Sequence, residues 1–224
     1  MGRALVRLCA DAPRAGRVVA AVSRTVSQRV VDGVPQFAVG ERDAVPPFDV
    51  AIDFSVPEAF DGVLALCVRR GAALVSGTTG LAPAQQAALA AAGETVPVLW
   101  AANYSIGVAV LSGLVERAAA SLAGWDCDIL EQHHVHKRDA PSGTALALGA
   151  RAAAGGAEPR YASVRAGDIV GEHAVQFTAV GERVELVHRA TDRDIFARGA
   201  LAAAARLAGR PPGLYSFAGL LLDA

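Results

Sequence analysis

The side chains best suited to chemistry lie between Glu131 and Ala145, a stretch that reads EQHHVHKRDAPSGTA. This stretch holds three histidines, a lysine and two carboxylates in an otherwise alanine-rich chain. His133 and Lys137 are four residues apart, which places both on one face of either a strand or a helix. We therefore expect these two proton-carrying groups to act on one substrate.

A helix is expected to begin beside this cluster. Ser142 follows Pro141 and is suited to cap a helix that runs from Gly143 through Ala154. The free backbone N–H groups of Gly143 and Thr144, with the positive end of the helix dipole, suit a carboxylate. The pattern therefore predicts an acidic ligand.

The cluster has two alternative interpretations. Its histidines could form a solvated strand end beside an ordinary helix cap, although the adjacency of so many reactive groups disfavours this interpretation. A zinc site is the other, because His134 and His136 would share a strand face. Neither a cysteine pair nor an H-E-x-x-H motif accompanies them, and His173 and His188 are isolated in the sequence, so we expect no metal.

Length and composition limit the class of protein. The 224 residues are 53% hydrophobic and 19% charged, which suits one large or two small globular domains. The net charge is −1 with both signs interspersed, and no apolar run has membrane-spanning length, so we expect neither a nucleic-acid partner nor a membrane partner. Three separated cysteines, Cys9, Cys67 and Cys127, predict reduced core thiols in a cytoplasmic protein.

The first half of the chain alternates short apolar runs with helical patterns, which is typical of a parallel sheet covered on both faces. Buried strands are expected at residues 17–23, 48–54, 72–76 and 96–102. Helices are expected at Pro57–Arg70 and Pro83–Ala92. Ser55 and Glu58 have the spacing of a capping box for the first of these helices.

Polar residues follow three of these strands directly. They are Asp53 and Ser55, then Gly77-Thr78-Thr79-Gly80, then Asn103-Tyr104-Ser105. Ligands of open parallel sheets bind outside the carboxyl ends of the strands, so we expect the three loops to line one crevice. Taken alone, Gly77-Thr78-Thr79-Gly80 could be an ordinary tight turn.

Beyond Ser105 fewer helices separate the strands. Helices are expected at about 107–122 and 193–207, and strands at 127–136, near 164, at 175–180 and at 184–187. This α+β order predicts a second domain with a mixed sheet. We place it at residues 105–193, and we assign residues 1–104 and 194–224 to the first, α/β domain.

The sequence resembles the dihydrodipicolinate reductase family over essentially its whole length. The family motif E-x-H-H-x-x-K-x-D-A-P-S-G-T-A is complete at 131–145. Further matches are DFSVP at 53–57, GTTG at 77–80, AANYSIGV at 101–108, RAG at 165–167, GEH at 171–173 and FARGAL at 196–201. The resemblance implies a Rossmann-like cofactor domain and a substrate and oligomerisation domain in a cytoplasmic homotetramer. It also implies NAD(P)H-dependent reduction of 4-hydroxy-tetrahydrodipicolinate, a small dicarboxylate, to tetrahydrodipicolinate in the diaminopimelate route to lysine.

The same resemblance implies roles for individual residues. His133 would be the proton donor, and Lys137 would assist protonation while it pairs with a substrate carboxylate. His134 and the amides of Gly143 and Thr144 would hold the carboxylates. The nicotinamide side of the cofactor crevice would be lined by Gly77, Thr78, Thr79, Ala101, Ala102, Asn103 and Tyr104. An imidazole with an ordinary pKa near 6.5 suits general acid catalysis near neutrality.

The sequence departs from the family pattern in two places. The family opens with a strand and a G-x-x-G-R-M-G-R loop, whereas this sequence begins Met1-Gly2-Arg3, so its first strand and phosphate-binding glycines are expected to be missing. We favour a start codon assigned too late over a degenerate protein. Where the family often has an acid, this sequence reads Ser23-Arg24, which can bond a 2′-phosphate and favours NADPH, with NADH as the alternative cofactor.

Two other functions stay open. One is a truncated, catalytically weak or non-catalytic homologue that acts as a binding protein, and the other is a related dehydrogenase of another small dicarboxylate. The intact cluster of His133, Lys137 and Ser142 argues against a binding protein, because binding alone does not require an acid.

Overall fold

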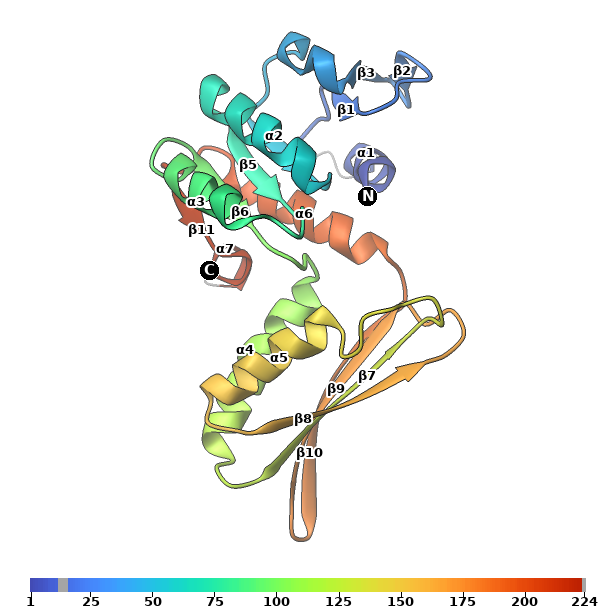
Figure 1. Ribbon diagram of the computed structural model, residues 1–224, viewed down its shortest axis with the longest axis vertical. Coiled ribbons are helices and arrows are strands. Elements are labelled where there is room, and N and C mark those ends of the chain that lie inside the picture. The colour runs from blue at the N-terminus through green and yellow to red at the C-terminus, as the bar shows by residue number, and fades with distance from the viewer. Residues whose placement is uncertain (12–15, 223–224) are drawn as a thin grey trace. The chain divides into compact units, whose positions relative to one another are not determined.

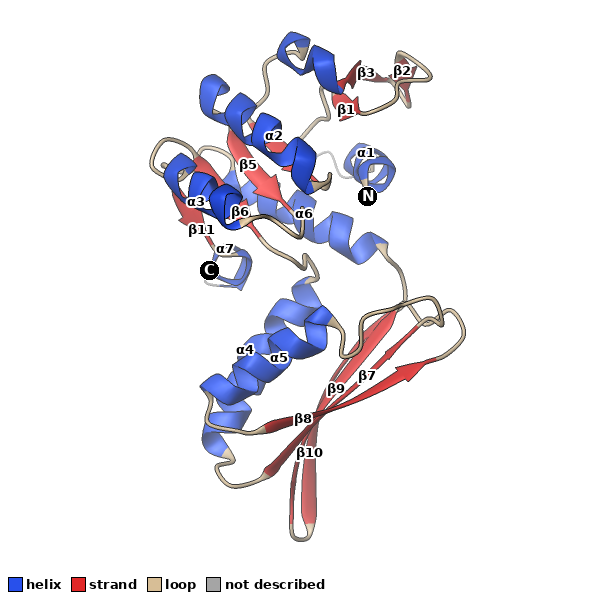
Figure 2. Ribbon diagram, in the orientation of Figure 1, coloured by secondary structure: helices blue, strands red, loops and turns tan. Residues whose placement is uncertain are grey.

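The computed structural model describes residues 1–11 and 16–222 (Figure 1). The chain divides into two compact units, of which unit 1 is Met1–Tyr104 with Phe196–Ala224 and unit 2 is Ser105–Ile195. Figure 2 shows strands and helices alternating in unit 1, and two helices on one face of a sheet in unit 2. None of the helices in the described ranges is both long and apolar enough to cross a membrane.

Unit 1 is built on a parallel four-stranded sheet with the order β11-β6-β5-β4. Its strands are β4 (Val50–Asp53), β5 (Ala73–Ser76), β6 (Pro97–Trp100) and β11 (Gly213–Tyr215). All four residues of β5 are buried, as expected for an inner strand covered on both faces. The parallel sheet confirms the predicted α/β class.

Five helices belong to unit 1 as far as the structure describes it. They are α1 (Gly2–Ala10), α2 (Pro57–Arg70), α3 (Pro83–Ala92), α6 (Asp194–Leu207) and α7 (Phe217–Leu222). Phe60 and Cys67 of α2 are fully buried in one core cluster with Leu74 of β5. Each such large apolar side chain contributes about 1.5–3 kcal/mol by leaving water.

The predicted capping box at the start of α2 is wrong. Val56 is the N-cap residue and makes no side-chain cap bond, while the Ser55 N–H donates to Asp53 Oδ1 at 3.0 Å. Pro57 occupies the first turn, where its fixed φ suits the helix start. Ser55 and Glu58 therefore lie one position too early for their expected capping roles.

A second, small sheet in unit 1 contains the strand expected at residues 17–23. Only Ala21–Ser23 forms a strand, β1, and it pairs in parallel with β3 (Val34–Ala38). Strand β2 (Val30–Val31) pairs antiparallel with β3, and a 3₁₀ helix follows at Val39–Ala44. β1 and β4 therefore belong to different sheets.

Unit 2 contains a mixed sheet with the order β10-β9-β7-β8, in which only β7 and β8 are parallel. Its strands are β7 (Asp126–His133), β8 (Pro159–Arg165), β9 (Gly171–Ala179) and β10 (Glu182–Ala190). Helices α4 (Ile106–Ser121) and α5 (Gly143–Ala154) cover one face (Figure 2). The mixed sheet confirms this part of the predicted fold.

The core of unit 2 lies between these helices and the sheet. Ile129, Val175 and Phe177 point from the strands, and Val115 and Leu148 from the helices, and all five are fully buried. Burial alternates along β7, so Glu131 and His133 face the same side as Ile129. The packing that forms the core therefore also directs these two polar side chains inward.

Candidate active site

A row of polar side chains crosses the sheet of unit 2 at directly paired positions of its four strands. They are His188 on β10, His173 on β9, Glu131 on β7 and Ser163 on β8. Paired residues point to the same face of a sheet. Ser105 and Ser142, the N-caps of α4 and α5, lie 3.3 Å and 3.2 Å from the Nε2 atoms of His188 and His173. Two helix N-termini therefore meet this polar row.

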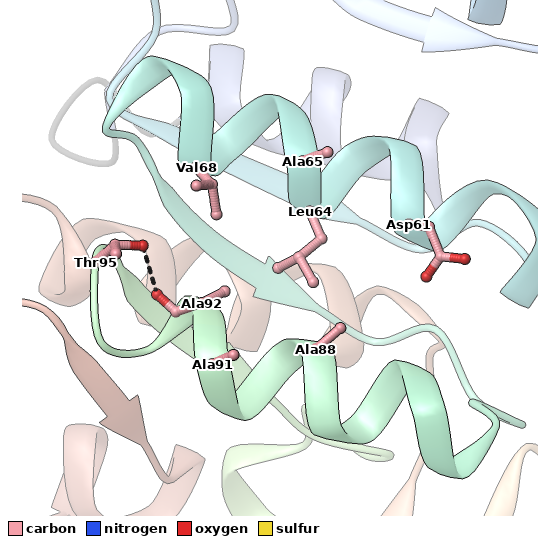
Figure 3. A pocket seen from close by; sticks show the side chains of 8 residues that line it. All are labelled: Asp61, Leu64, Ala65, Val68, Ala88, Ala91, Ala92 and Thr95. Atoms are coloured by element: carbon pink, nitrogen blue, oxygen red, sulfur yellow. Dashed lines mark hydrogen bonds between the residues drawn. The ribbon is translucent and has the colours of Figure 1, made fainter.

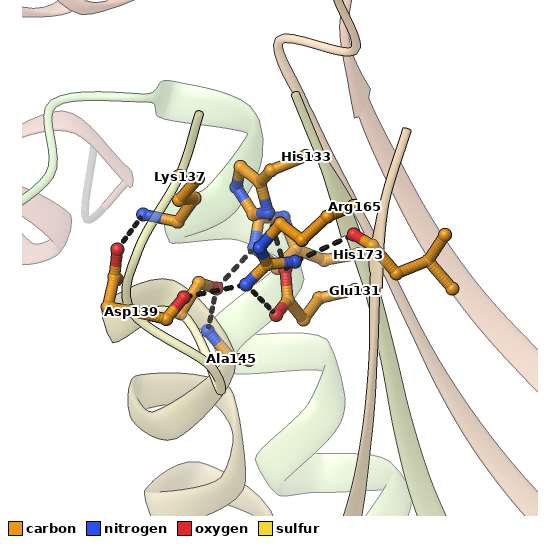
Figure 4. Close-up of polar contacts among 9 residues, drawn as sticks. Glu131, His133, Lys137, Asp139, Ala145, Arg165 and His173 are labelled. Carbon is orange, nitrogen blue, oxygen red and sulfur yellow. Dashed lines mark hydrogen bonds and ion pairs between the residues drawn. The ribbon is translucent and has the colours of Figure 1, made fainter. Parts of the chain in front are cut away.

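Glu131 is the carboxylate of the row and is completely buried. Arg165 binds it in bidentate fashion, with Nη2 donating to Oε1 at 2.7 Å and Nη1 to Oε2 at 3.0 Å (Figure 4). Burial alone would raise the pKa of Glu131, but hydrogen bonds from Arg165, Ser163 and His133 outweigh it and lower the pKa to about 2. Glu131 is thus ionised at neutral pH.

His133 is the last residue of β7, and its ring lies beside Glu131. Its Nδ1 is hydrogen-bonded to Glu131 Oε2, and because the carboxylate carries no proton, Nδ1 is the donor (Figure 4). The ring packs edge-to-face against His173, with centroids 5.2 Å apart. Nε2 therefore faces away from Glu131 and is the ring nitrogen placed to exchange a proton with a ligand.

Burial lowers the pKa of three histidines of the site, which are His133, His173 and His188. Burial lowers the pKa of His133 below its ordinary value of 6.5; Glu131 raises it, and the charges of Lys137 and Arg165 lower it. Burial, then the charge of His133, lowers the pKa of His173 to about 4. His173 is therefore neutral at pH 7, whereas the opposing charges around His133 control how readily it takes up a proton.

Lys137 lies in the loop after β7, so the prediction that a regular element would align it with His133 is wrong. β7 ends at His133, and a turn follows in which the Lys137 N–H donates to the His134 carbonyl at 3.1 Å. The turn still leaves Lys137 close enough for its charge to lower the pKa of His133. Its Nζ pairs with Asp139 Oδ1 at 2.8 Å (Figure 4).

Ser142 caps α5 as predicted, since its Oγ accepts a hydrogen bond from the Ala145 N–H at 3.2 Å. The predicted contact of the Gly143 amide with a ligand stays a prediction, and the Gly143 backbone lies close enough to the Asp139 carboxylate to help lower its pKa. The hydrogen bond from Lys137 is the main cause that lowers the pKa of Asp139. An internal carboxylate thus lies between Lys137 and the first residue of α5, where an acidic ligand was expected.

His134 comes directly before the turn and His136 lies in it, so neither is on a strand face, because β7 ends before them. Their ring centroids are 6.2 Å apart. They border a cavity of about 350 Å³ whose other lining residues are Gly167, Asp168, Val170 and Arg193. Within the described ranges, no three His, Cys, Asp or Glu side chains are grouped to hold a metal ion. The cavity thus combines two imidazoles and one guanidinium with the carboxylate of Asp168.

The loops that end the parallel strands of unit 1 are joined by hydrogen bonds around the buried Asp53. Its Oδ2 accepts from Thr78 Oγ1 at 2.7 Å and from Ser76 Oγ at 2.9 Å. Trp100 Nε1 donates to the Thr78 carbonyl at 2.7 Å. The carboxyl ends of β4, β5 and β6 are thereby held together.

The residues predicted to line the cofactor crevice differ in accessibility. Thr78 and Tyr104 are buried, and Tyr104 packs between Phe54 and Phe217 while its hydroxyl donates to the Ser76 carbonyl at 2.8 Å. Thr79 and Ala102 are exposed, and Gly77, Ala101 and Asn103 are half-buried. Thr78 and Tyr104 therefore support the loops from inside, and the other five present backbone and side-chain surface.

Gly77 has a steric reason to be glycine. A Cβ at this position would lie 2.3 Å from the Phe54 ring. Arg24 is exposed directly after β1 and belongs to the small sheet rather than to these loops. The structure thus groups the predicted strand-end residues but leaves Arg24 on another sheet.

A separate cavity of about 460 Å³ lies against α2 and α3 (Figure 3). It is lined by Asp61, Leu64, Ala65, Val68, Ala88, Ala91, Ala92 and Thr95. None of the predicted site residues borders it, so it is not part of the candidate site.

Sequence reasoning did not assign a role to Arg165, Glu131 or Arg193. Arg165 and Glu131 stand within matched motifs, and the carboxylate two residues before a histidine is a sequence signal that could have identified Glu131. Arg193 carried no comparable signal, because it meets His134 and His136 only through the fold.

Residues 1–104 match the family model described as dihydrodipicolinate reductase, N-terminus, and residues 107–221 match the model of its C-terminus. A 4-hydroxy-tetrahydrodipicolinate reductase from Stenotrophomonas maltophilia is 66% identical over 222 residues, covering 99% of this chain and 93% of that protein. A protein of the same name from Xanthomonas campestris pv. campestris is 65% identical with the same coverage.

A solved structure shares the fold. The dipicolinate-bound dihydrodipicolinate reductase from Paenisporosarcina sp. TG-14 matches with a TM-score of 0.71 at 22% identity, covering 88% of this chain and 86% of that one. This likeness concerns the fold alone. The family is shown by the two family models and by the relatives at 65–66% identity, of whose length the chain covers 93%. The chain belongs to the dihydrodipicolinate reductase family.

Proposed function

We propose that this protein reduces 4-hydroxy-tetrahydrodipicolinate to tetrahydrodipicolinate with NADPH, or with NADH as the alternative, in the diaminopimelate route to lysine. The observation that carries the proposal is the ionised Glu131 beside His133, with Lys137 in the adjoining loop, in a chain 66% identical to a named reductase. A buried acid–imidazole pair next to a cation suits protonation of an anionic substrate.

The cofactor would bind at the carboxyl ends of the parallel strands of unit 1. The residues fit this use, because Thr79 and Ala102 are exposed there and Gly80 has a φ of 77°, a conformation in which backbone can approach a ligand closely. We infer that Arg24 pairs with the 2′-phosphate of NADPH. The bound nicotinamide supplies the hydride, and the protein supplies alignment and charge.

The substrate would bind in unit 2, where donors for two carboxylates exist. One carboxylate would replace Asp139 beside Lys137 and the N-terminus of α5 formed by Gly143 and Thr144. The other would enter the cavity lined by His134 and Arg193. Protonated His133 would then transfer the Nε2 proton to the carbon next to the one that receives the hydride.

We also propose a cytoplasmic homotetramer assembled through unit 2, with unit 1 as the cofactor domain. The face of the sheet that α4 and α5 do not cover carries an apolar row of directly paired residues, Val187, Ala174, Leu130 and Ala162. Val187 is 40% exposed in the single chain. Such an apolar row on an uncovered sheet face supports association between subunits.

The decisive experiment is a substrate-dependent assay of NADPH oxidation with the purified protein. Oxidation that requires fresh 4-hydroxy-tetrahydrodipicolinate supports the proposal. Binding of dipicolinate without any turnover would instead favour the binding protein, and turnover of a different dicarboxylate alone would favour the related dehydrogenase.

A further inference from the structure

We propose that Glu131 is the positioning residue of the proton donor: it holds the proton of His133 on Nδ1 and thereby makes Nε2 the nitrogen that serves the substrate. This inference rests on the proposed reductase function and assigns Glu131 a part in it. Glu131 has no exposed surface, so it acts through His133 rather than by touching the substrate.

The backbone of β7 fixes the pair. Residues 131 and 133 are two positions apart on one strand, so both side chains point to the helix-covered face. Glu131 in turn is held by the two bonds from Arg165 and by Ser163 on the neighbouring strand β8. The imidazole therefore has a partner that cannot rotate away from it.

Arg165 connects the Glu131–His133 pair to the loop after β7 that carries Lys137. Besides binding Glu131, its Nη2 donates to the Asp139 backbone carbonyl at 2.6 Å. Asp139 is the partner of Lys137. One guanidinium thus orients the carboxylate behind His133 and the loop that carries the second cation.

The charges that face His133 explain why a carboxylate is needed. Lys137 from the loop and Arg165 from β8 are cations, and both disfavour a protonated imidazole. His173 on β9 packs against the ring, and Glu131 is the anion whose contact raises the pKa of His133. Glu131 therefore supports the protonated, proton-donating form against two nearby cations.

The proton balance follows from these contacts. Protonated His133 carries Nδ1–H toward Glu131 and Nε2–H toward the substrate. In the transfer the Nε2–H bond breaks and a C–H bond forms on the substrate. The ring that remains is neutral, and its Nδ1–H stays hydrogen-bonded to the Glu131 carboxylate. Arg165 keeps Glu131 ionised, so the carboxylate does not remove the proton from Nδ1.

The test compares Glu131→Gln with Glu116→Gln in steady-state kinetics over a range of pH. Glu116 of α4 pairs with Arg151 of α5 at 3.1 Å, so the same substitution there removes a carboxylate–arginine pair that is exposed and lies outside the polar row. We expect Glu131→Gln to lower kcat about tenfold or more with a smaller change in KM. We expect Glu116→Gln to leave both parameters unchanged.

The pH profile separates positioning from a general loss of structure. Activity requires protonated His133 and therefore falls as the pH rises through its pKa. Removal of the Glu131 charge lowers that pKa, so the alkaline limb of kcat moves to lower pH in Glu131→Gln and stays in place in Glu116→Gln. A folded Glu131→Gln enzyme with unchanged kcat and an unchanged limb would overturn the inference.

Two further measurements separate a failure of this inference from a failure of the proposed function and from a variant that does not fold. If the unaltered protein oxidises no NADPH with 4-hydroxy-tetrahydrodipicolinate, the proposed function itself fails. If it does, and His133→Gln is equally active, His133 is not the proton donor and the inference about Glu131 fails while the function stands. If Glu131→Gln does not fold, ¹⁵N NMR of the histidine rings in the unaltered protein decides the matter. A neutral His133 protonated on Nδ1 supports the inference, and one protonated on Nε2 contradicts it.

Discussion

Gly171 lies against the side of the His133 ring that is turned away from Glu131. A Cβ added to Gly171 would sit 3.0 Å from Nε2 and 3.2 Å from Cδ2 of His133. Gly171 begins β9 and does not have a positive φ, so its backbone does not require glycine. The missing side chain instead leaves space beside the nitrogen that we propose to serve the substrate.

Gly171→Ala is therefore expected to lower kcat about tenfold, because the new methyl group displaces the imidazole or the substrate from its working position. Steady-state kinetics will measure this. Gly113→Ala is the matched control, since a Cβ at Gly113 meets nothing within 4 Å and alanine is favourable inside α4. Equal activity of the two variants would show that the space beside Nε2 has no catalytic use.

His133→Gln is expected to lower kcat by about 10²–10⁴-fold while the affinity for dipicolinate changes little. A proton donor acts in the transition state, so its loss affects turnover more than binding. Titration calorimetry with dipicolinate and steady-state kinetics give the two quantities. A variant that loses affinity but keeps turnover would place His133 among the substrate-binding groups only.

Lys137→Ala is expected to raise KM for the dicarboxylate and to lower kcat, because it removes both a carboxylate partner and a charge beside His133. The KM for NADPH should not change. An effect confined to NADPH affinity would show that Lys137 belongs to the cofactor site.

Arg24→Ala is expected to lower kcat/KM for NADPH about tenfold and to leave kcat/KM for NADH unchanged, since only NADPH carries a 2′-phosphate. The value for NADH in the same variant is the internal control. Preference of the unaltered protein for NADH would contradict the placement of the ribose-binding turn at Ser23-Arg24.

His173 is expected to make the protein less stable in mild acid. Its pKa is lowered from 6.5 to about 4 in the folded chain, so between these two pH values the unfolded chain binds the proton and the folded chain does not. The free energy of unfolding should therefore fall by up to about 1.4 kcal/mol per pH unit as the pH decreases through this range.

Urea unfolding at several pH values will test this. His173→Gln should show a shallower loss of stability between pH 6.5 and pH 4, whereas His136→Gln, a change at an exposed position in the turn, should keep the original slope. A slope that is the same in all three proteins would show that His173 does not titrate with a lowered pKa.

The sequence allowed the helices near the site to be predicted because local signals mark their ends. Pro57 and Gly71 bracket α2, and Ser142 with Pro141 marks the start of α5. Such signals depend on residues next to each other in the chain. The predicted bounds of α2, α3 and α5 therefore agree with the structure.

The end of β7 could not be predicted in the same way. The alternation of side chains continues past His133, but the Val135 N–H donates to the Gly167 carbonyl at 3.2 Å instead of continuing the ladder. The partners of Glu131 and Lys137 were also hidden, because Arg165 is 34 residues away from Glu131 and because Asp139 reaches Lys137 only after the turn. These contacts depend on tertiary structure.

The double attachment of Arg165 also constrains attempts to engineer this enzyme. Its guanidinium holds the Glu131 carboxylate and, through the Asp139 carbonyl, the loop of Lys137. A substitution at Arg165 chosen to move the working pH would release that loop at the same time, and a change in the loop chosen to accept a bulkier acid would alter the strength of the proton donor. Changes in acidity and in substrate range are therefore coupled at Arg165, whereas Ser163, whose hydrogen bond helps to lower the pKa of Glu131, offers a position from which the acidity can be varied without substituting Arg165.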